Sequence, residues 1–517
     1  MKALITFVSF FVLILFANLI QSQPGSLDES FGTGGIVIAP LTTHGEHGYA
    51  GTIQPDGKIL VAGFQDVSGS KNFAVARYNT NGSLDNSFGT GGLTLFDAGT
   101  DADAAWTMAL QDDGKIILGG SVNNQFTTFD DYALVRLNSD GTPDNTFGTG
   151  GLVMTDIDGH WDNAYDMVLQ DDGKILLAGQ GYTNSNRKVC VVRYNTDGTL
   201  DASFGAGGIA INVIGCGVEK TRAIALQADG KIIVAGYFNE GTDDQAFVTR
   251  FNSDGTVDNT FGNNGTATLD IAGNKDRFWT LYVLPDGKIL AGGTTDPADD
   301  PDYLLVKYLS DGTLDNSFGS NGIAMNNLGV NDFLSDMIVD ADGKILTAGG
   351  AFSFELVRFL DTGYPDTDFG TNGIVNTSIG NFCFAYSVCL QANGRIIVSG
   401  HSSDGNDYDL AVARYHAVEG SYVDEQSALF AHVNVFPNPV SAGNNINLEY
   451  TLEEDEELSI ELLSINGKLL EVLSEKQNSK AGPHKENFKL PGALSAGIYF
   501  VRLTSSQGSA VVRLEVF

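Results

Sequence analysis

Residues 84–92 read Leu-Asp-Asn-Ser-Phe-Gly-Thr-Gly-Gly, and close copies of this phrase occur seven times along the chain. The copies recur about every 57 residues. Self-similarity at this period predicts one supersecondary unit repeated as a solenoid or a propeller. The phenylalanines of the seven copies are Phe31, Phe88, Phe147, Phe204, Phe261, Phe318 and Phe369.

Two further features recur in step with this phrase. The first is a hairpin with Asp-Gly or Asn-Gly between apolar runs, which supplies the positive φ angles of a tight turn. It occurs at residues 55–63, 112–120, 171–179, 228–236, 285–293, 341–349 and 392–400. The second is an apolar strand that carries a cation, at residues 73–79, 132–138, 189–195, 246–252, 303–309, 354–360 and 410–416. Each repeat therefore contains four short strands: one on each side of the hairpin turn, the cation-bearing strand, and one after the Phe-Gly phrase.

Four strands per repeat with glycine-rich turns are typical of a propeller blade. The repeats begin and end out of phase, because strand 36–41 precedes the first complete unit and the last unit stops after Arg414. We therefore predict an all-β chain with a seven-bladed β-propeller of four-stranded blades over residues 23–416. Its N-terminal strand closes the last blade by pairing with strand 410–415, which removes an exposed sheet edge.

By these three motifs the chain resembles the delta-60 repeat family, secreted bacterial proteins described as β-propellers of unknown function. The resemblance covers roughly residues 25–416, and the copies at 365–370 and 393–395 are weaker. It implies a fold and no activity. Fourteen of the 29 cations follow the repeat, directly after the hairpin turns or in the third strands, so we expect them to pair with repeat aspartates.

The composition changes after a linker at residues 417–430, and residues 431–517 are predicted to form a small β-sandwich. Three segments occur there in order: 435–440 with Phe-Pro-Asn-Pro, 460–470 with an Asn-Gly-Lys hairpin, and 496–503, which reads Ala-Gly-Ile-Tyr-Phe-Val-Arg-Leu. Together they resemble a type A sorting domain of the type IX secretion system, over residues 434–517. The resemblance implies a Bacteroidetes-type outer-membrane exporter as partner and removal of the domain after passage. The alternative is an immunoglobulin-like module that itself binds a ligand.

The first 22 residues have the composition of a secretory signal peptide, with an uncleaved membrane anchor as the alternative. No other segment is apolar enough to form a membrane-spanning helix. The net charge of −35 argues against nucleic acid, which needs clustered Lys and Arg. It is compatible with Ca²⁺ or cationic partners. We therefore expect a secreted or cell-surface protein.

One face of the propeller is predicted to carry the uniform repeat turns, and the opposite face carries segments that differ in every blade. Function lies disproportionately on loops held by a rigid frame, so we expect it on this variable face. Counting eight residues back from the glycine of each Asp-Gly or Asn-Gly turn gives Tyr49, Trp106, Tyr165, Arg222, Trp279, Ser335 and Tyr386. The five aromatics and the arginine are expected to ring the channel mouth and to suit sugar stacking or peptide capture. The alternative is that they pack between blades.

Two candidate metal sites remain open. His44, His47 and His401, with Asp404 or Asp407, are residue types suited to a His/carboxylate metal site, although loop histidines without a metal are commoner. The segments 138–144 and 252–258 are similar to part of an oxygen-ligand Ca²⁺ loop. Asx turns explain the same residues without an ion.

Motifs of catalysis are missing from the sequence, including Gly-x-Ser-x-Gly, His-Glu-x-x-His, the phosphate loop and the dinucleotide fingerprint. We therefore predict a non-enzymatic propeller that binds a glycan or a protein through its variable face and is exported by a type IX-like system. The alternative is an extracellular polysaccharide hydrolase or lyase with its site at the channel mouth.

Overall fold

The computed structural model is built of β-strands, and no α-helix occurs in the part of the chain that it describes, which confirms the all-β prediction. None of the described segments is a helix able to cross a membrane. The predicted signal peptide and nearly all of the predicted linker lie outside the described residues. These are 23–42, 44–67, 69–98, 103–124, 129–183, 186–215, 217–241, 243–297, 300–328, 332–350, 352–405, 407–417, 430–438, 440–452, 454–464, 469–492, 494–495, 497–505 and 509–516.

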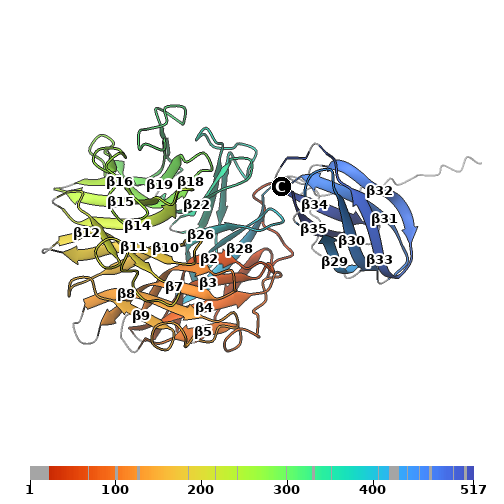
Figure 1. Ribbon diagram of the computed structural model, residues 1–517, viewed down its shortest axis with the longest axis horizontal. Coiled ribbons are helices and arrows are strands. Elements are labelled where there is room, and N and C mark those ends of the chain that lie inside the picture. The colour runs from red at the N-terminus through yellow and green to blue at the C-terminus, as the bar shows by residue number, and fades with distance from the viewer. Residues whose placement is uncertain are drawn as a thin grey trace, which may run out of the picture.

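Seven four-stranded antiparallel sheets make up the described part of the repeat region (Figure 1). The innermost strands are β2 (Gly45–Ile53), β6 (Ala104–Leu110), β10 (Asn163–Leu169), β14 (Glu219–Leu226), β18 (Arg277–Val283), β22 (Leu334–Val339) and β26 (Phe382–Leu390). The second strands are β3 (Ile59–Val67), β7 (Ile116–Asn124), β11 (Ile175–Thr183), β15 (Ile232–Glu240), β19 (Ile289–Thr295), β23 (Ile345–Gly349) and β27 (Arg395–Ser403).

The third strands are β4 (Ser70–Tyr78), β8 (Phe129–Leu137), β12 (Asn186–Tyr194), β16 (Asp243–Phe251), β20 (Asp302–Tyr308), β24 (Phe354–Phe359) and β28 (Tyr408–His416). The outermost strands are β5 (Leu93–Phe96), β9 (Leu152–Thr155), β13 (Ile209–Asn212), β17 (Thr266–Leu269), β21 (Ile323–Asn326), β25 (Ile374–Thr377) and β1 (Ile36–Ala39). We number the blades one to seven from the sheet that begins with β2.

The blades form a closed circle. Each innermost strand contacts the innermost strand of the next blade, and β26 of blade seven contacts β2 of blade one. The last blade has the strand order β1-β28-β27-β26. Its outer pair is antiparallel, with Ile36 opposite Ala413 and Ala39 opposite Leu410. The prediction that the N-terminal strand closes the last blade is therefore confirmed.

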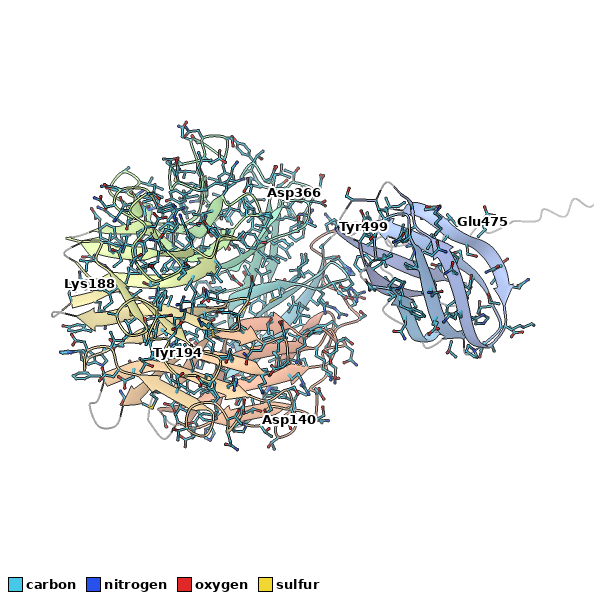
Figure 2. The ribbon with its side chains drawn as sticks, viewed as in Figure 1. Asp140, Lys188, Tyr194, Asp366, Glu475 and Tyr499 are labelled. Atoms are coloured by element: carbon cyan, nitrogen blue, oxygen red, sulfur yellow. The ribbon has the colours of Figure 1, made fainter. Side chains whose placement is uncertain are left out.

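The core lies between neighbouring blades. Leu60 and Phe73 of blade one share a cluster with Ile116 and Val135 of blade two. Phe31 is fully buried where blade seven meets blade one, so the N-terminal phrase completes that interface. Tyr194 of blade three is also fully buried, and its hydroxyl donates a hydrogen bond to Thr155 Oγ1 (2.9 Å) (Figure 2). Asp140 and Asp366, also labelled in Figure 2, belong to the repeat turns.

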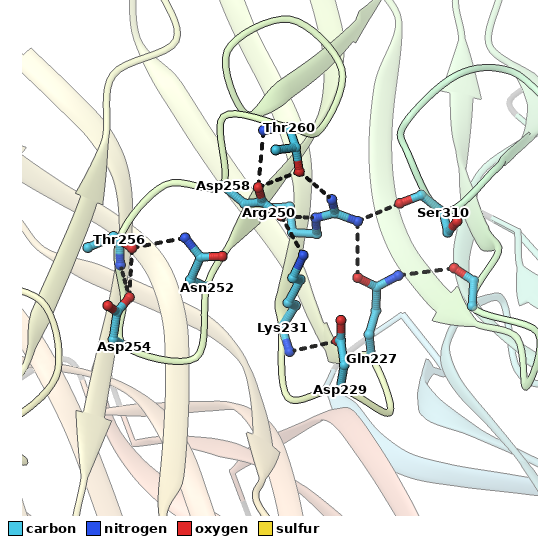
Figure 3. Close-up of polar contacts among 11 residues, drawn as sticks. Gln227, Asp229, Lys231, Arg250, Asn252, Asp254, Thr256, Asp258, Thr260 and Ser310 are labelled. Carbon is cyan, nitrogen blue, oxygen red and sulfur yellow. Dashed lines mark hydrogen bonds and ion pairs between the residues drawn. The ribbon is translucent and has the colours of Figure 1, made fainter.

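The repeat cations pair with repeat aspartates, as predicted. In blade four, Asp258 accepts from Arg250 Nε (2.8 Å) and from Lys231 Nζ (2.9 Å) (Figure 3). The guanidinium of Arg250 also donates to the backbone carbonyl of Ser310 in blade five and lies 4.7 Å from the centroid of Phe261. The repeated phrase therefore supplies both the aspartate and the aromatic ring that hold a cation joining two blades.

Blade five departs from this pattern, because Lys307 stands where the other blades have arginine. Asp315 still pairs with Lys288 (3.0 Å), but the Lys307 amine lies 5.5 Å from the centroid of Phe318. A cavity of ≈ 250 Å³ is lined there by residues that include Leu284, Lys307 and Asp361. A larger cavity, of ≈ 600 Å³, lies at the equivalent place beside Arg250 between blades four and five, so the lysine does not by itself account for the space.

Replacing Lys307 with arginine is expected to raise the free energy of unfolding by about 1 kcal/mol. The guanidinium would pair with Asp315 and donate to a backbone carbonyl of blade six, as Arg250 does one blade earlier. Chemical denaturation of the purified protein measures the effect. Lys307→Met is the control, since its side chain cannot donate and should not stabilise. A lower midpoint for the arginine variant than for the wild type would contradict the prediction.

The C-terminal unit consists of two sheets, which confirms the predicted β-sandwich. One sheet has the order β29-β30-β33 and the other β32-β31-β34-β35. Leu448, Leu462 and Val501 are fully buried in the cluster between them. The Asn-Gly-Lys turn lies outside the described residues. The strands are β29 (Phe430–Phe436), β30 (Asn445–Leu452), β31 (Glu456–Ser464), β32 (Leu469–Ser479), β33 (Gly482–Lys489), β34 (Gly497–Thr504) and β35 (Ser509–Val516).

Candidate functional site

Every position of the predicted ring is the extra residue of a β-bulge. In β6, Ala105 pairs with Gly120 and Thr107 with Gly119, so Trp106 has no partner across the ladder. A bulge turns the side chain of the extra residue away from the regular alternation of the strand. The same shift in register occurs at Tyr49, Tyr165, Arg222, Trp279, Ser335 and Tyr386.

A glycine of the second strand makes each bulge possible. A Cβ atom on Gly120 would lie 1.9 Å from the carbonyl oxygen of Ala104, far inside van der Waals contact. The corresponding glycines show the same close approach, at 1.6 to 2.0 Å: Gly63, Gly179, Gly236, Gly293, Gly349 and Gly400. The motifs of the sequence did not reveal the bulges, although the repeated glycine of the second strand is a signal for them.

The structure brings the six predicted ring residues together in one continuous arc. The centroid of Tyr49 lies 4.6 Å from those of both Tyr386 and Trp106, and Trp106 lies 6.2 Å from Tyr165. The Arg222 guanidinium then bridges two further rings, at 4.2 Å from Tyr165 and 4.9 Å from Trp279.

Ser335 occupies the seventh ring position, between Trp279 and Tyr386. The ring contacts therefore follow six of the seven blades. All seven side chains of the ring are half-buried. They contact one another and keep part of their surface accessible, so the arrangement is compatible with both the ligand-contact and the packing interpretations.

A cluster of histidine and tyrosine rings adjoins the arc at blades seven and one. His47 and His401 lie 4.8 Å apart between ring centroids, and Tyr408 contacts both. His401 also stacks on Tyr386 at 5.3 Å. Burial lowers the pKa of His401 to about 3, with the neighbouring His47 as a further cause, so its imidazole is neutral near pH 7.

The predicted His/carboxylate metal site is brought together only in part. His47 and His401 are neighbours within the aromatic cluster, whereas the backbone of His44 exchanges hydrogen bonds with the hydroxyl of Thr42. Among the described residues, the one group of three possible ligands whose atoms lie within 4.8 Å of one another is Asp131, Asp156 and Asp162. The histidine metal site therefore stays a prediction.

The candidate calcium segments form Asx turns. Asp140 Oδ1 accepts from the backbone N–H of Thr142 (2.9 Å) and from its hydroxyl (2.7 Å), and Asp254 binds Thr256 in the same way. Asp144, which ends the first segment, pairs with Arg136 (2.8 Å). These contacts match the alternative to an ion that the sequence left open, and Ca²⁺ binding stays a prediction.

Buried acids precede the ring by three residues in six blades, and our sequence analysis did not single them out. Asp162 accepts the backbone N–H of Ile157 (2.7 Å) and that of Tyr182 (2.8 Å), which fixes the connection that enters the blade. Burial raises the pKa of Asp162 to about 6. The equivalent acids are Glu46, Asp103, Glu219, Asp276 and Asp332, and Cys383 takes the position in blade seven.

Blade six holds one further buried acid, Glu355, and its replacement tests the effect of pH on stability. Burial raises the pKa of Glu355 to about 7, beside the Tyr303 hydroxyl. A raised pKa means that the folded state holds the proton of Glu355 more tightly than the unfolded chain does. The contribution of Glu355 to stability is therefore greatest at low pH and is lost as the pH rises through about 7. Glu355→Gln is therefore expected to stabilise the protein, relative to wild type, by about 1–3 kcal/mol more at pH 8 than at pH 5.

Denaturation at a series of pH values measures this difference. Glu29→Gln, at an exposed position, is the control and should show no such trend. A constant offset between Glu355→Gln and wild type from pH 5 to pH 8 would contradict the linkage.

Comparison with known proteins identifies both units. Six segments match the family model described as a domain of unknown function (DUF5122) beta-propeller, at residues 54–88, 111–147, 170–204, 227–261, 284–318 and 391–421. The repeats between residues 54 and 421 match this β-propeller family. Residues 434–516 match the secretion system C-terminal sorting domain, which confirms the predicted sorting domain. This domain indicates type IX handling and a secreted or outer cell-surface location.

A search of curated proteins gives no significant match. Solved structures with a similar fold are distant in sequence. Polysaccharide lyase Uly1 has 14% identity and a TM-score of 0.44, with 75% of this chain and 93% of that chain covered. Virginiamycin B lyase from Staphylococcus aureus has 12% identity and a TM-score of 0.41, with coverages of 73% and 98%. The propeller domain of the Trilobed protease from Pyrococcus furiosus has 11% identity and a TM-score of 0.38, with coverages of 73% and 96%.

Proposed function

We propose that this DUF5122 propeller is a secreted, non-enzymatic module that binds a glycan through the arc of Tyr49, Trp106, Tyr165, Arg222, Trp279 and Tyr386. The observation that supports it is the series of bulges that directs these side chains toward one another and leaves each partly accessible. Aromatic faces bind the apolar faces of sugar rings, and a few polar groups at the same site give orientation.

The arc sits on rigid elements, which supports a binding role. Each ring residue lies within a four-stranded sheet whose second-strand glycine fixes the bulge. The buried acids described above hold the connections that lead into the innermost strands. A site preorganised in this way loses little conformational entropy when it binds a ligand.

Glycan-array binding with the purified propeller tests the proposal. Trp106→Ala and Trp279→Ala are each expected to abolish binding of the glycan that the wild type retains. Trp161→Ala is the matched control, because Trp161 is 45% exposed and lies outside the arc. Thermal melting of each variant checks that it is folded. The proposal is overturned if folded Trp106→Ala and Trp279→Ala variants bind the glycan as well as the wild type does. It is also overturned if the wild type binds no glycan on the array.

A polysaccharide hydrolase or lyase is the second candidate. The observation that favours it is the His47–His401 pair, 4.8 Å apart between ring centroids and beside Tyr386 of the arc, because histidine is the side chain most often used for proton transfer. Steady turnover of a polysaccharide that is lost in His401→Gln would favour the enzyme. Binding without turnover across a broad polysaccharide panel would favour the non-enzymatic module.

A further inference from the structure

The propeller's remaining cations gather in one sector. Outside the two repeated positions it carries seven Lys or Arg residues, and all except Lys71 fall between residues 187 and 277: Arg187, Lys188, Lys220, Arg222, Lys275 and Arg277. This segment covers blades three to five, and the chain as a whole has a net charge of −35. With nine cations against eleven acids, residues 187–277 are less acidic than the chain as a whole, and this concentration of cations favours an anionic partner here.

Three of these cations surround one tyrosine of the second strand of blade four. The ring of Tyr237 lies 5.2 Å from Lys220 Nζ, 5.9 Å from the Arg222 guanidinium and 5.3 Å from that of Arg277. Since Arg222 also lies over Tyr165 and Trp279, the cations and the aromatic arc form a single surface.

Two of the three cations lack a carboxylate partner. Arg277 pairs with Asp244 (2.5 Å), and the other ion pairs of the sector use Lys188 with Glu219 and Lys275 with Asp296. Lys220 and Arg222 form no ion pair with any acid in the described part of the chain, and Arg222 Nε is buried without a hydrogen-bond acceptor.

The acid that follows Tyr165 in the sequence does not supply this acceptor. Asp166, next to Tyr165, already accepts from the backbone N–H of Met167 (2.8 Å), the backbone N–H of Ile224 (2.9 Å) and the Thr107 hydroxyl (3.1 Å). An unpaired buried guanidinium N–H is costly unless a ligand satisfies it.

We propose that Arg222 and Lys220 bind the carboxylate of a uronic-acid residue while Tyr165 and Trp279 flank its sugar ring. The ligand class is therefore an acidic polysaccharide. A guanidinium fork matches a carboxylate with two parallel hydrogen bonds. The inference rests on the proposed function and specifies the substrate class of the same arc.

Affinity electrophoresis and calorimetry with alginate and polygalacturonate test the proposal, each beside its carboxyl-reduced, neutral form. The wild type is expected to bind at least one acidic polymer about tenfold or more tightly than its reduced form. Arg222→Met, which removes the guanidinium but keeps an unbranched side chain, is expected to lose about 10- to 100-fold of that affinity and to bind the reduced polymer as the wild type does. Lys220→Met should lose less, because an ammonium lacks the bidentate geometry.

Lys71→Met is the matched control, since it removes the one non-repeat cation of the propeller that lies outside residues 187–277, in blade one. Equal affinity of Arg222→Met and wild type for the acidic polymer overturns the inference. The inference is also overturned if the wild type binds dextran sulfate but neither alginate nor polygalacturonate, or if it binds none of these polymers. Loss of polymer binding in Trp279→Ala together with an unaffected Arg222→Met would leave the proposed function standing and reject only the carboxylate assignment.

Discussion

Replacing Asp28 with alanine is expected to lower the free energy of unfolding of the propeller by about 3–5 kcal/mol. Asp28 Oδ2 lies 2.7 Å from Arg414 Nε and 2.9 Å from Arg395 Nε, and all three side chains are buried. Removing the carboxylate leaves two guanidinium groups at the closing blade without their anion. An uncompensated buried charge is among the most destabilising results of a single substitution.

The position of Asp28 makes this ion pair specific to ring closure. In blades one to six the aspartate follows the cation of its own blade in sequence, as Asp85 follows Arg77. In blade seven the aspartate comes from the N-terminal segment instead, next to the strand that pairs with β28. Loss of Asp28 therefore weakens the contact that joins the two ends of the repeat region.

Denaturant unfolding of the Asp28→Ala variant measures the effect, with Glu29→Ala as the control. Glu29 is the neighbouring acid and is exposed, so its removal should change stability by less than about 0.5 kcal/mol. Asp28→Ala with Arg414→Met should recover part of the loss, because one uncompensated charge is then removed as well. Equal stabilities of the Asp28 and Glu29 variants would contradict the argument.

The same ion pair predicts how acid acts on the closure. Burial raises the pKa of Asp28. The hydrogen bonds from Ser30 and the charges of Arg414 and Arg395 lower it by more, so the pKa lies below its usual value. A lowered folded-state pKa means that this stabilisation is present above the pKa of the unfolded chain. It is lost as the pH falls through the folded-state pKa.

The repeat predicted the blades and their closure because its signals are local. Asp-Gly turns and short apolar strands specify a hairpin without reference to distant residues, and seven copies define the period. The closing strand followed from the phase difference between the two ends of the repeat, which needed no knowledge of side-chain contacts.

The sequence predicted the ring residues on the innermost strands but did not reveal the bulges that orient them. Counting back from the hairpin glycine placed Trp106 and Arg222 correctly on the innermost strands. The bulge beneath them depends on the register of two strands, and the contact of Arg222 with Tyr165 and Trp279 depends on the spacing of three blades. Neither quantity is encoded within one repeat.

The surroundings of His47 and His401 also depend on contacts between distant parts of the chain. His47 and His401 are 354 positions apart in the chain, and closure of the ring places them 4.8 Å apart. Their residue type suggested a metal site; aromatic rings surround His401 and its burial lowers its pKa, while Asp66 and Asp407 act on His47. Burial of a side chain is a property of the assembled circle, so residue type alone did not predict it.

Replacing Gly120 with alanine is the second substitution with a large expected effect, a loss of at least about 3 kcal/mol in the free energy of unfolding. The new methyl group would lie 1.9 Å from the carbonyl oxygen of Ala104. That obstacle is backbone, so relief requires the bulge at Trp106 to move or the β6–β7 pairing to open.

Gly119 provides a control in the same strand. Its added methyl group would meet side chains only, 2.8 Å from Thr107 Cγ2 and 2.9 Å from Leu177 Cδ1, and these can shift by rotation. Gly119→Ala is therefore expected to lose less stability than Gly120→Ala when both are measured by denaturation. If the two variants lose the same amount, the close backbone approach does not set the cost.

The two variants also connect the scaffold to the site. Because Trp106 is the extra residue of the bulge that Gly120 permits, any displacement forced by the alanine moves Trp106 relative to Tyr49 and Tyr165. Under conditions where both variants remain folded, Gly120→Ala should weaken glycan binding and Gly119→Ala should leave it nearly intact. Such a difference would mean that the invariant glycines of the repeat serve the variable face, since they position the side chains that differ from blade to blade.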